Sequence, residues 1–273
     1  MVEMGNVWDR TGEFVSDNLA SVVPVALLTL FVPMSIIPNL SDAMTDAPLL
    51  PKALMALGTI PLALVSLWGQ LVLTALALDF GSDREARAVA LRRLPAAILV
   101  AVIVGIGAAL IFVPCWVVLY AFGVPLASDA LRTLPPAAAA RPLAFVALYA
   151  LVAMPFALWL IARLLVTTPV IVNEAMSLGA IVRAFRLTRG VALKIVGVMI
   201  LYFIVSWVAV TAAKLVFGSV FRLVAGGGGT MSLSAVLTSV IVAVIQTVFG
   251  ILVATFVAKL YQALIYAHAT ARA

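Results

Sequence analysis

Two charged residues in an otherwise apolar stretch, Arg163 and Glu174, are the first candidates for chemistry. About three helical turns separate them, so they share one face of a straight helix. At 1.5 Å per residue they lie roughly 16 Å apart along the axis and cannot pair directly. Each therefore needs a partner of its own, for which Asp79, Gln70 and the arginines of a nearby basic segment are the candidates.

Two roles fit this pair, because charge buried in lipid is costly and usually faces a bundle interior or a watery cavity. In one interpretation, Arg163 and Glu174 line a polar cavity that binds a headgroup or a solute. In the other, both lie near the cytoplasmic interface and tie an arginine-rich helix to the bundle. That helix would start near Ser177, with Ser177 or Asn173 as its cap.

The basic segment that follows is a candidate surface for anionic lipid. Arg183, Arg186, Arg189 and Lys194 would fall within an arc of roughly 140° on one continuous helix. A basic surface beside a membrane attracts anionic lipid by about 1 kcal/mol per charge. Arg163, Glu174, Arg183, Arg186 and Arg189 form the candidate lipid-binding or ligand-binding set. Alternatively, the arginines only set the orientation of the chain in the membrane.

The sequence offers little material for catalysis or metal binding. His268 is the only histidine and has no Cys, Asp or Glu beside it, which is unlike a metal site. The single cysteine, Cys115, lies in an apolar run and is expected to pack as a small apolar side chain. The glycines at 226–229 lack the lysine of a phosphate-binding loop. We therefore expect no catalytic residues, no metal, no cofactor and no enzymatic activity.

Composition places the chain in a membrane. Of its 273 residues, 65% are hydrophobic and only 10% are charged, and the mean hydropathy is +1.24. A soluble domain is nearer half apolar and a quarter charged. This excludes a soluble globular enzyme, a disordered chain and a nucleic-acid-binding module. The apolar runs are far longer than barrel strands, so the prediction is an all-α, polytopic transmembrane helical bundle.

Six apolar segments are long enough to cross a bilayer, and they form one membrane domain over residues 1–273. Two short amphipathic basic helices are expected between spans two and three and between spans four and five. Spans three and four exceed the required length, so they must tilt, bend or project beyond the membrane. Pro114 and Pro155 lie where each span could bend, and we expect a kinked or projecting hairpin around Ser128 to Arg141. Gly105 and Gly107 are expected to permit close helix contact. The spans are predicted near 19–40, 53–80, 95–122, 142–172, 191–217 and 233–263, the third beginning at Pro95.

The distribution of Lys and Arg predicts the orientation. The loops after spans two and four carry most of the arginines, so this side should be cytoplasmic and should hold both termini. Residues 1–18 alternate acids with apolar residues near helical spacing. They are either an amphipathic interfacial helix anchored by Trp8 or a plain lead-in to span one.

A weak internal repeat relates residues 53–126 to residues 142–217. Arg87, Ala88, Leu91, Arg93 and Val100 match Arg183, Ala184, Leu187, Arg189 and Val196 at an offset of 96 residues. Both units would enter the membrane in the same sense, as in a parallel repeat. Chance similarity is an equally good explanation.

A longer motif carries a family resemblance. Residues 154–200 join a proline-led span, an arginine within it, an aliphatic run ending in Glu174, and a basic helix of the form A-x-R-L-T-R-G. This pattern, with the amino-terminal VWDRTGEFVSDNLASVVPVALL, resembles the YciC-type family of uncharacterised bacterial inner-membrane proteins. It is also similar to the membrane domain of some glycerophosphoryl diester phosphodiesterases. The chain departs from the pattern at Pro155-Phe156, where Pro-Gly is usual.

The resemblance implies a six-helix protein of the bacterial inner membrane, and it implies no phosphodiesterase activity. Our leading expectation is non-enzymatic binding or organisation of lipid or envelope components. The expected partners are membrane lipids, including anionic ones, and a homo-oligomer is compatible with the sequence; nucleic acid is excluded. The alternative is a small transporter or channel with a polar cavity near Arg163 and Glu174.

Overall fold

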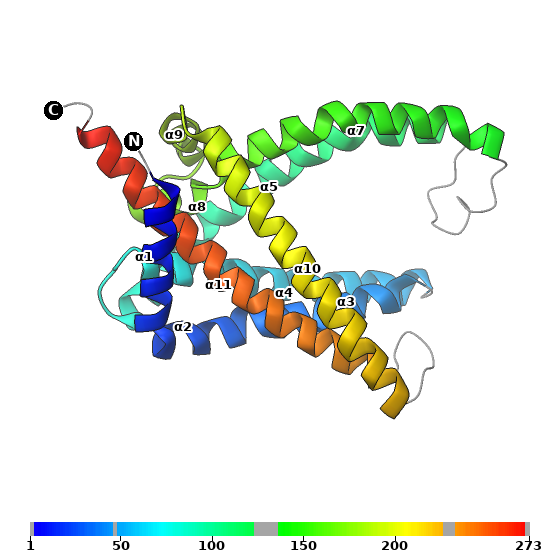
Figure 1. Cartoon of the computed structure of the whole chain (residues 1–273), viewed down its shortest axis with the longest axis horizontal. Coiled ribbons are helices and arrows are strands. Elements are labelled where there is room, and N and C mark those ends of the chain that lie inside the picture. Colours follow the sequence, from blue (N-terminus) through cyan, green and yellow to red (C-terminus); the bar gives the residue numbers. More distant parts are fainter. Residues whose placement is uncertain (1–2, 46–47, 123–135, 226–232, 271–273) are drawn as a thin grey trace.

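The computed structural model describes residues 3–45, 48–122, 136–225 and 233–270, and every regular element in these ranges is a helix (Figure 1). The all-α prediction is therefore confirmed. In chain order the elements are α1 (Met4–Asp17), α2 (Leu19–Ala26), the π-helix η1 (Leu27–Phe31), α3 (Val32–Thr45), α4 (Leu49–Ala77), α5 (Asp83–Ala121), α7 (Pro136–Leu164), α8 (Thr167–Glu174), α9 (Gly179–Leu187), α10 (Ala192–Ala225) and α11 (Leu233–Thr270).

Six helical stretches within these ranges are long and apolar enough to cross a membrane, as expected from the sequence. The amino-terminal helix α1, the short helices α8 and α9, and the end of α11 all gather at one end of the molecule (Figure 1). Both termini therefore lie at the same end, which we call the termini end. The six stretches are Leu19–Ser41, Leu49–Ala77, Asp83–Ala121, Arg141–Glu174, Ala192–Phe221 and Leu233–Thr270.

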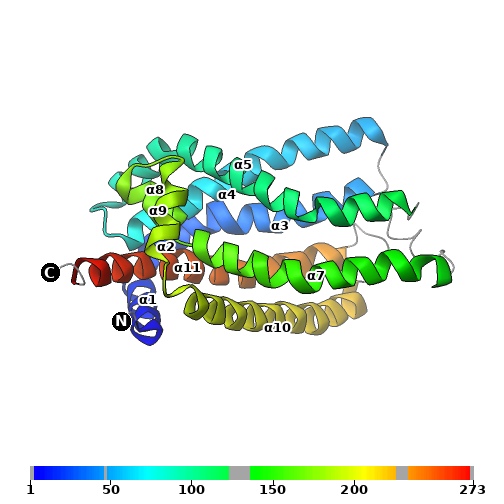
Figure 2. The same cartoon turned by 90° about the horizontal axis from the view of Figure 1, so that it is seen from above.

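Helix α11 is central, with α1 on one side of it and α8 and α9 on the other (Figure 2). Its second half supplies much of the buried core, including Ala258, Leu260 and Tyr261. The apolar stretches of α5, α7 and α10 are buried far less than those of α4 and α11. Much of the apolar surface of α5, α7 and α10 is thus free to contact lipid or another chain.

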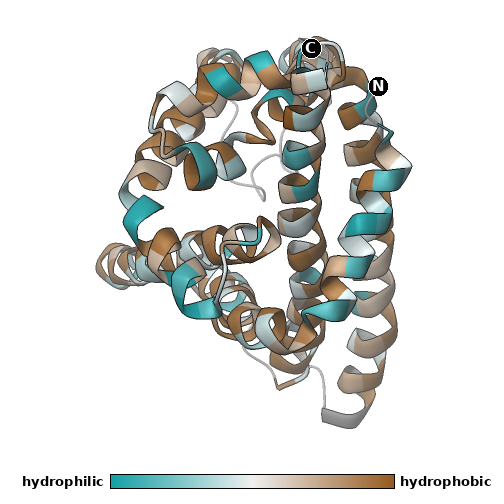
Figure 3. Cartoon of the chain, turned by 90° about the vertical axis from the view of Figure 1, so that its left-hand side faces the viewer, coloured by the Kyte–Doolittle hydropathy of each residue, from teal (hydrophilic) through white to brown (hydrophobic). Residues whose placement is uncertain are grey.

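Residues 4–17 form a separate amphipathic helix rather than a continuous lead-in to span one. Val7, Thr11 and Phe14 recur at helical spacing and are buried, and α1 packs against α11. The rings of Trp8 and Phe256 lie 5.6 Å apart, and Lys259 Nζ lies 4.8 Å from the centre of the Phe14 ring. Figure 3, coloured by hydropathy, shows hydrophilic residues along the outer side of this helix. Protein contacts therefore cover the apolar side of α1.

The first basic segment is not the separate short helix that the sequence suggested. A capping box starts α5 at Ser82: the Ser82 hydroxyl accepts from the Glu85 amide, and the Glu85 carboxylate accepts from the Ser82 amide. From there one helix runs to Ala121, with Pro95 inside it. The prediction that the third helix begins at Pro95 is therefore wrong, because the cap lies more than three turns earlier; the uncharged, apolar part of this helix does follow Pro95.

Span four is interrupted, but not at Pro155. Helix α7 continues through Pro155 to Leu164, a turn follows at residues 165–166, and α8 begins at Thr167. Pro169 sits in the first turn of α8, where its missing N–H costs nothing. Helix α5 likewise continues through Pro114. Most of the predicted hairpin, up to residue 135, lies outside the described residues.

Two glycines of α5 do not have the expected role. A side-chain carbon added at Gly105 or at Gly107 would meet nothing within 4 Å. The close approach occurs instead at Gly69 of α4, which lies against Thr29 of η1. The prediction that Gly105 and Gly107 permit close helix contact within the chain is therefore wrong.

Candidate functional site

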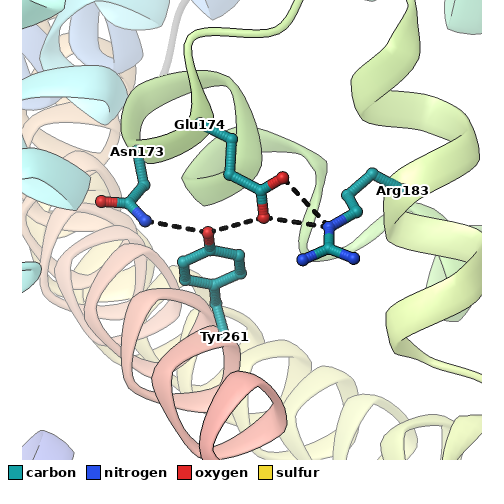
Figure 4. Close-up of polar contacts among 4 residues, drawn as sticks. All are labelled: Asn173, Glu174, Arg183 and Tyr261. Carbon is teal, nitrogen blue, oxygen red and sulfur yellow. Dashed lines mark hydrogen bonds and ion pairs between the residues drawn. The ribbon is translucent and has the colours of Figure 1, made fainter. Parts of the chain in front are cut away.

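A cluster of four polar side chains joins α8, α9 and α11 at the termini end (Figure 4). Helix α8 ends at Glu174, because Ala175 adopts a left-handed conformation with φ of 59°. The chain then turns back into α9, which places Arg183 beside the Glu174 carboxylate. Arg183 Nε lies 3.0 Å from both Glu174 oxygens. The side chains of Glu174 and Arg183 are 17% and 38% exposed, so the pair is partly shielded from water.

The Glu174 carboxylate also accepts a hydrogen bond from the core. Tyr261 Oη donates to Glu174 Oε1 at 3.0 Å, and Asn173 Nδ2 donates to Tyr261 Oη at 3.0 Å. Tyr261 is only 1% exposed, so its hydroxyl needs partners within the protein. One carboxylate thus receives donors from α9 and α11, which fixes both helices to the end of α8.

Arg163 is bound to the same basic helix by different contacts. Its guanidinium donates to the Phe185 carbonyl of α9 at 2.9 Å and lies over the rings of Trp159 and Phe185, at 5.1 and 5.9 Å. The Thr188 hydroxyl reaches back to the Arg163 carbonyl at 3.5 Å and to the Ala184 carbonyl at 2.8 Å. Arg163 and Glu174 therefore hold the second half of α9 to α7 and α8.

Only one of the expected partners of Arg163 and Glu174 contacts either residue in the part of the chain that the structure describes. Arg163 and Glu174 do not contact each other, as their spacing predicted, and Glu174 takes an arginine of the basic segment. Asp79 lies elsewhere: its carboxylate is 3.8 Å from Lys259 Nζ on α11. The structure records no hydrogen bond between Gln70 and either charged residue in the described ranges. Asn173 serves Tyr261, and no side chain caps the start of α9.

The remaining basic residues do not share one helix. Helix α9 ends at Leu187, and a turn at residues 188–191, with Gly190 at φ of 89°, precedes α10. Arg186 is on α9, Arg189 is in the turn and Lys194 is on α10. The expected common arc is therefore wrong, because it assumed a continuous helix. All three side chains are exposed, and they make no ion pair within the described chain.

The sequence assigned Arg93 no role beyond a topology charge and one position of the weak repeat, yet in the fold it lies on the inward-facing side of α5. The buried residues of α5 are Ala86, Ala90, Ala97 and Val100, and Arg93 falls on the same stripe. Its Nε atom is buried and has no hydrogen-bond partner. Arg92, the next residue, is exposed. The sequence did contain a signal for this inward position, because the alanines at 86, 90 and 97 lie on the same helix face as Arg93.

The side chains of this cluster are bound to one another, and together they hold three helices. Among the described residues, no three His, Cys, Asp or Glu side chains lie close enough to hold a metal ion. The Glu174 carboxylate is occupied by Arg183 and Tyr261. His268 Nδ1 lies 2.9 Å from the Leu264 carbonyl of its own helix.

Comparisons with protein-family models, with curated proteins and with solved structures gave no significant match to this chain.

Proposed function

We propose that this chain is a non-enzymatic, multi-pass protein of the bacterial inner membrane that binds or organises anionic lipid at its termini end. Both termini would face the cytoplasm, because the arginine-rich segments gather at that end. The YciC-type resemblance of residues 154–200 supports the same class of protein. The exposed apolar surface of α5, α7 and α10 suits contact with lipid or with a second copy.

The observation that carries the proposal is the mixed surface of the α9 segment. Leu178, Val182 and Arg186 follow one another at four-residue spacing and are all exposed, with Val182 at 54%. Arg189 and Lys194 extend the basic part, and Leu193, at 82% exposure, extends the apolar part. Such a helix suits the membrane interface, where acyl chains meet the apolar residues and headgroups meet the cations.

The contacts of Glu174 and Arg163 hold α9, and with it this surface, in one position on the helix bundle. Arg183 is neutralised by Glu174, so it contributes little charge to lipid. Arg186, Arg189 and Lys194 have no such acid in the described chain, and about 1 kcal/mol of attraction each is expected from them. A transporter cavity around Arg163 and Glu174 gains no support from these contacts, because both side chains are used to hold α9.

Replacing the three exposed cations tests the proposal. We expect Arg186→Gln/Arg189→Gln/Lys194→Gln to lower the enrichment of anionic over zwitterionic lipid around the purified protein by roughly a hundredfold, since about 3 kcal/mol of attraction is removed. Lipid retained by the protein in mixed nanodiscs, counted by mass spectrometry, measures this enrichment. The matched control, Arg84→Gln/Arg87→Gln/Lys214→Gln, removes equal charge elsewhere. Equal losses in both triple variants would show that net charge, and not the α9 segment, attracts the lipid.

A further inference from the structure

Arg93 stands out because it is an arginine on the bundle-facing stripe of α5 whose Nε has no partner. Buried polar groups are almost always hydrogen-bonded, so an orphaned donor points to a missing water, ion or ligand. The structure records no hydrogen bond or ion pair for the Arg93 side chain within the described ranges. Nothing in the α9 lipid surface uses this residue.

Three other buried polar atoms in the described ranges lack a hydrogen-bond partner. One, Arg163 Nε on α7, belongs to a guanidinium that already binds the Phe185 carbonyl, and the other two lie on helices that pack against α5. Trp68 Nε1 belongs to α4 and Thr167 Oγ1 belongs to α8, and both helices contact α5. Trp68 precedes the end of α4 by nine residues, and Arg93 follows the start of α5 by ten. At 1.5 Å per residue, both are therefore about 14–15 Å from the turn that joins the two antiparallel helices. Indole N–H and guanidinium N–H groups both donate, and a hydroxyl can donate as well.

The level of Arg93 in the membrane indicates the kind of acceptor. Charged residues fill the first turns of α5, and after Pro95 the helix is apolar as far as Ala121. Arg93 is thus the last charge before the apolar part, which is the level of lipid phosphates. A guanidinium fork matches phosphate oxygens with two parallel hydrogen bonds.

We propose that Arg93 binds the phosphate of an anionic lipid headgroup between α5 and its neighbours α4 and α8, with Trp68 and Thr167 as further donors. This inference rests on the proposed lipid-binding function and adds a specific headgroup site to it. The α9 surface attracts anionic lipid through exposed charges, which salt screens. The Arg93 site is partly buried, so its binding persists in high salt, where the Debye length is about 3 Å at 1 M.

The adjacent pair Arg92 and Arg93 provides the test, because both changes remove one charge and only Arg93 faces the bundle. The full-length protein in neutral detergent is titrated with phosphatidylglycerol, phosphatidylcholine or inorganic phosphate at about 1 M salt. Bound lipid is counted by native mass spectrometry after exchange to low salt, and the thermal unfolding midpoint is followed in parallel. Wild type and Arg92→Met should bind phosphatidylglycerol alike. Arg93→Met should bind it at least about tenfold more weakly, since charge-assisted hydrogen bonds are lost.

Several outcomes separate this site from a merely structural arginine. Without lipid, Arg93→Met should unfold at the same temperature as wild type or higher, because an orphaned donor has been removed. A lower midpoint without lipid would make Arg93 a structural residue and overturn the proposal. Stabilisation by inorganic phosphate to the same degree would place a free phosphate, not a lipid, in the site. Equal affinity of the Arg92 and Arg93 variants for phosphatidylglycerol also overturns the Arg93 site. The Arg186/Arg189/Lys194 variant tests the α9 surface, and its result has no bearing on the Arg93 site. As a second variant, Thr167→Val should weaken binding by a smaller factor.

Discussion

Gly69→Ala should be among the most destabilising single substitutions in this protein. A methyl group at position 69 would overlap Thr29 Oγ1 and Thr29 Cβ and would lie 3.1 Å from Thr29 Cγ2. Thr29 Cβ is fixed to the backbone of η1, so rotation of the side chain cannot relieve the overlap. Helices α4 and η1 must therefore separate. We expect a loss of about 3 kcal/mol in the free energy of unfolding, the upper part of the range for overpacked cores.

Unfolding of the detergent-solubilised protein in rising SDS, followed by tryptophan fluorescence, measures this loss. Gly107→Ala is the matched control, because it lies in a helix and its added carbon meets nothing within 4 Å. It should leave stability unchanged or raise it by up to about 1 kcal/mol. The double variant Gly69→Ala/Thr29→Gly should be less destabilised than the sum of its single changes. Additive losses would mean that Gly69 does not act through Thr29.

The sequence predicted the first span but not the π-helix within it. The apolar length of residues 19–40 predicted a span, and the structure has one at Leu19–Ser41. Pro33 cannot donate to the carbonyl of Thr29, and its ring crowds that carbonyl. The wider turn of η1 at Leu27–Phe31 accommodates this conflict. A proline signals a disturbed helix, but which turn widens and which neighbour it then touches depend on tertiary packing.

The charges at the termini end likewise include contacts that the sequence predicted and contacts that depend on tertiary packing. The spacing of Arg163 and Glu174 was enough to exclude a direct pair, and the basic segment was a correct source for the partner of Glu174. The carbonyl that binds Arg163 and the tyrosine that binds Glu174 could not be read from local spacing, since Tyr261 is 87 positions away from Glu174. The inward position of Arg93 was missed because the sequence placed it in a separate short helix before span three. In the structure one helix runs from Asp83, and Arg93 lies on the same face as its buried residues.

Removing the Glu174 carboxylate should release α9 and cost about 3 kcal/mol. In Glu174→Ala, the buried Tyr261 hydroxyl loses its acceptor, which costs about 1–3 kcal/mol. Arg183 loses a two-oxygen contact at 3.0 Å, which adds about 1 kcal/mol because the arginine is partly exposed. Amide hydrogen exchange should therefore speed up in residues 179–187 more than in α4 or α11. The α9 lipid surface should weaken with it, although Glu174 itself contacts no lipid in our proposal.

A double-mutant cycle separates the two contributions to the Glu174 effect. Glu174→Ala and Arg183→Ala should show a coupling energy of about 1 kcal/mol, and Glu174→Ala and Tyr261→Phe a coupling of similar size. The control is the second ion pair, between Asp79 and Lys259, which is longer at 3.8 Å and has a carboxylate side chain that is 75% exposed. Asp79→Asn tolerates the positive φ at this position and should change stability by less than about 0.5 kcal/mol. Equal effects at Glu174 and Asp79, or exchange that rises uniformly along the chain, would show that Glu174 is no specific tether of α9. A local rise confined to α9 would show instead that one carboxylate, bound from two helices, fixes the basic surface in place.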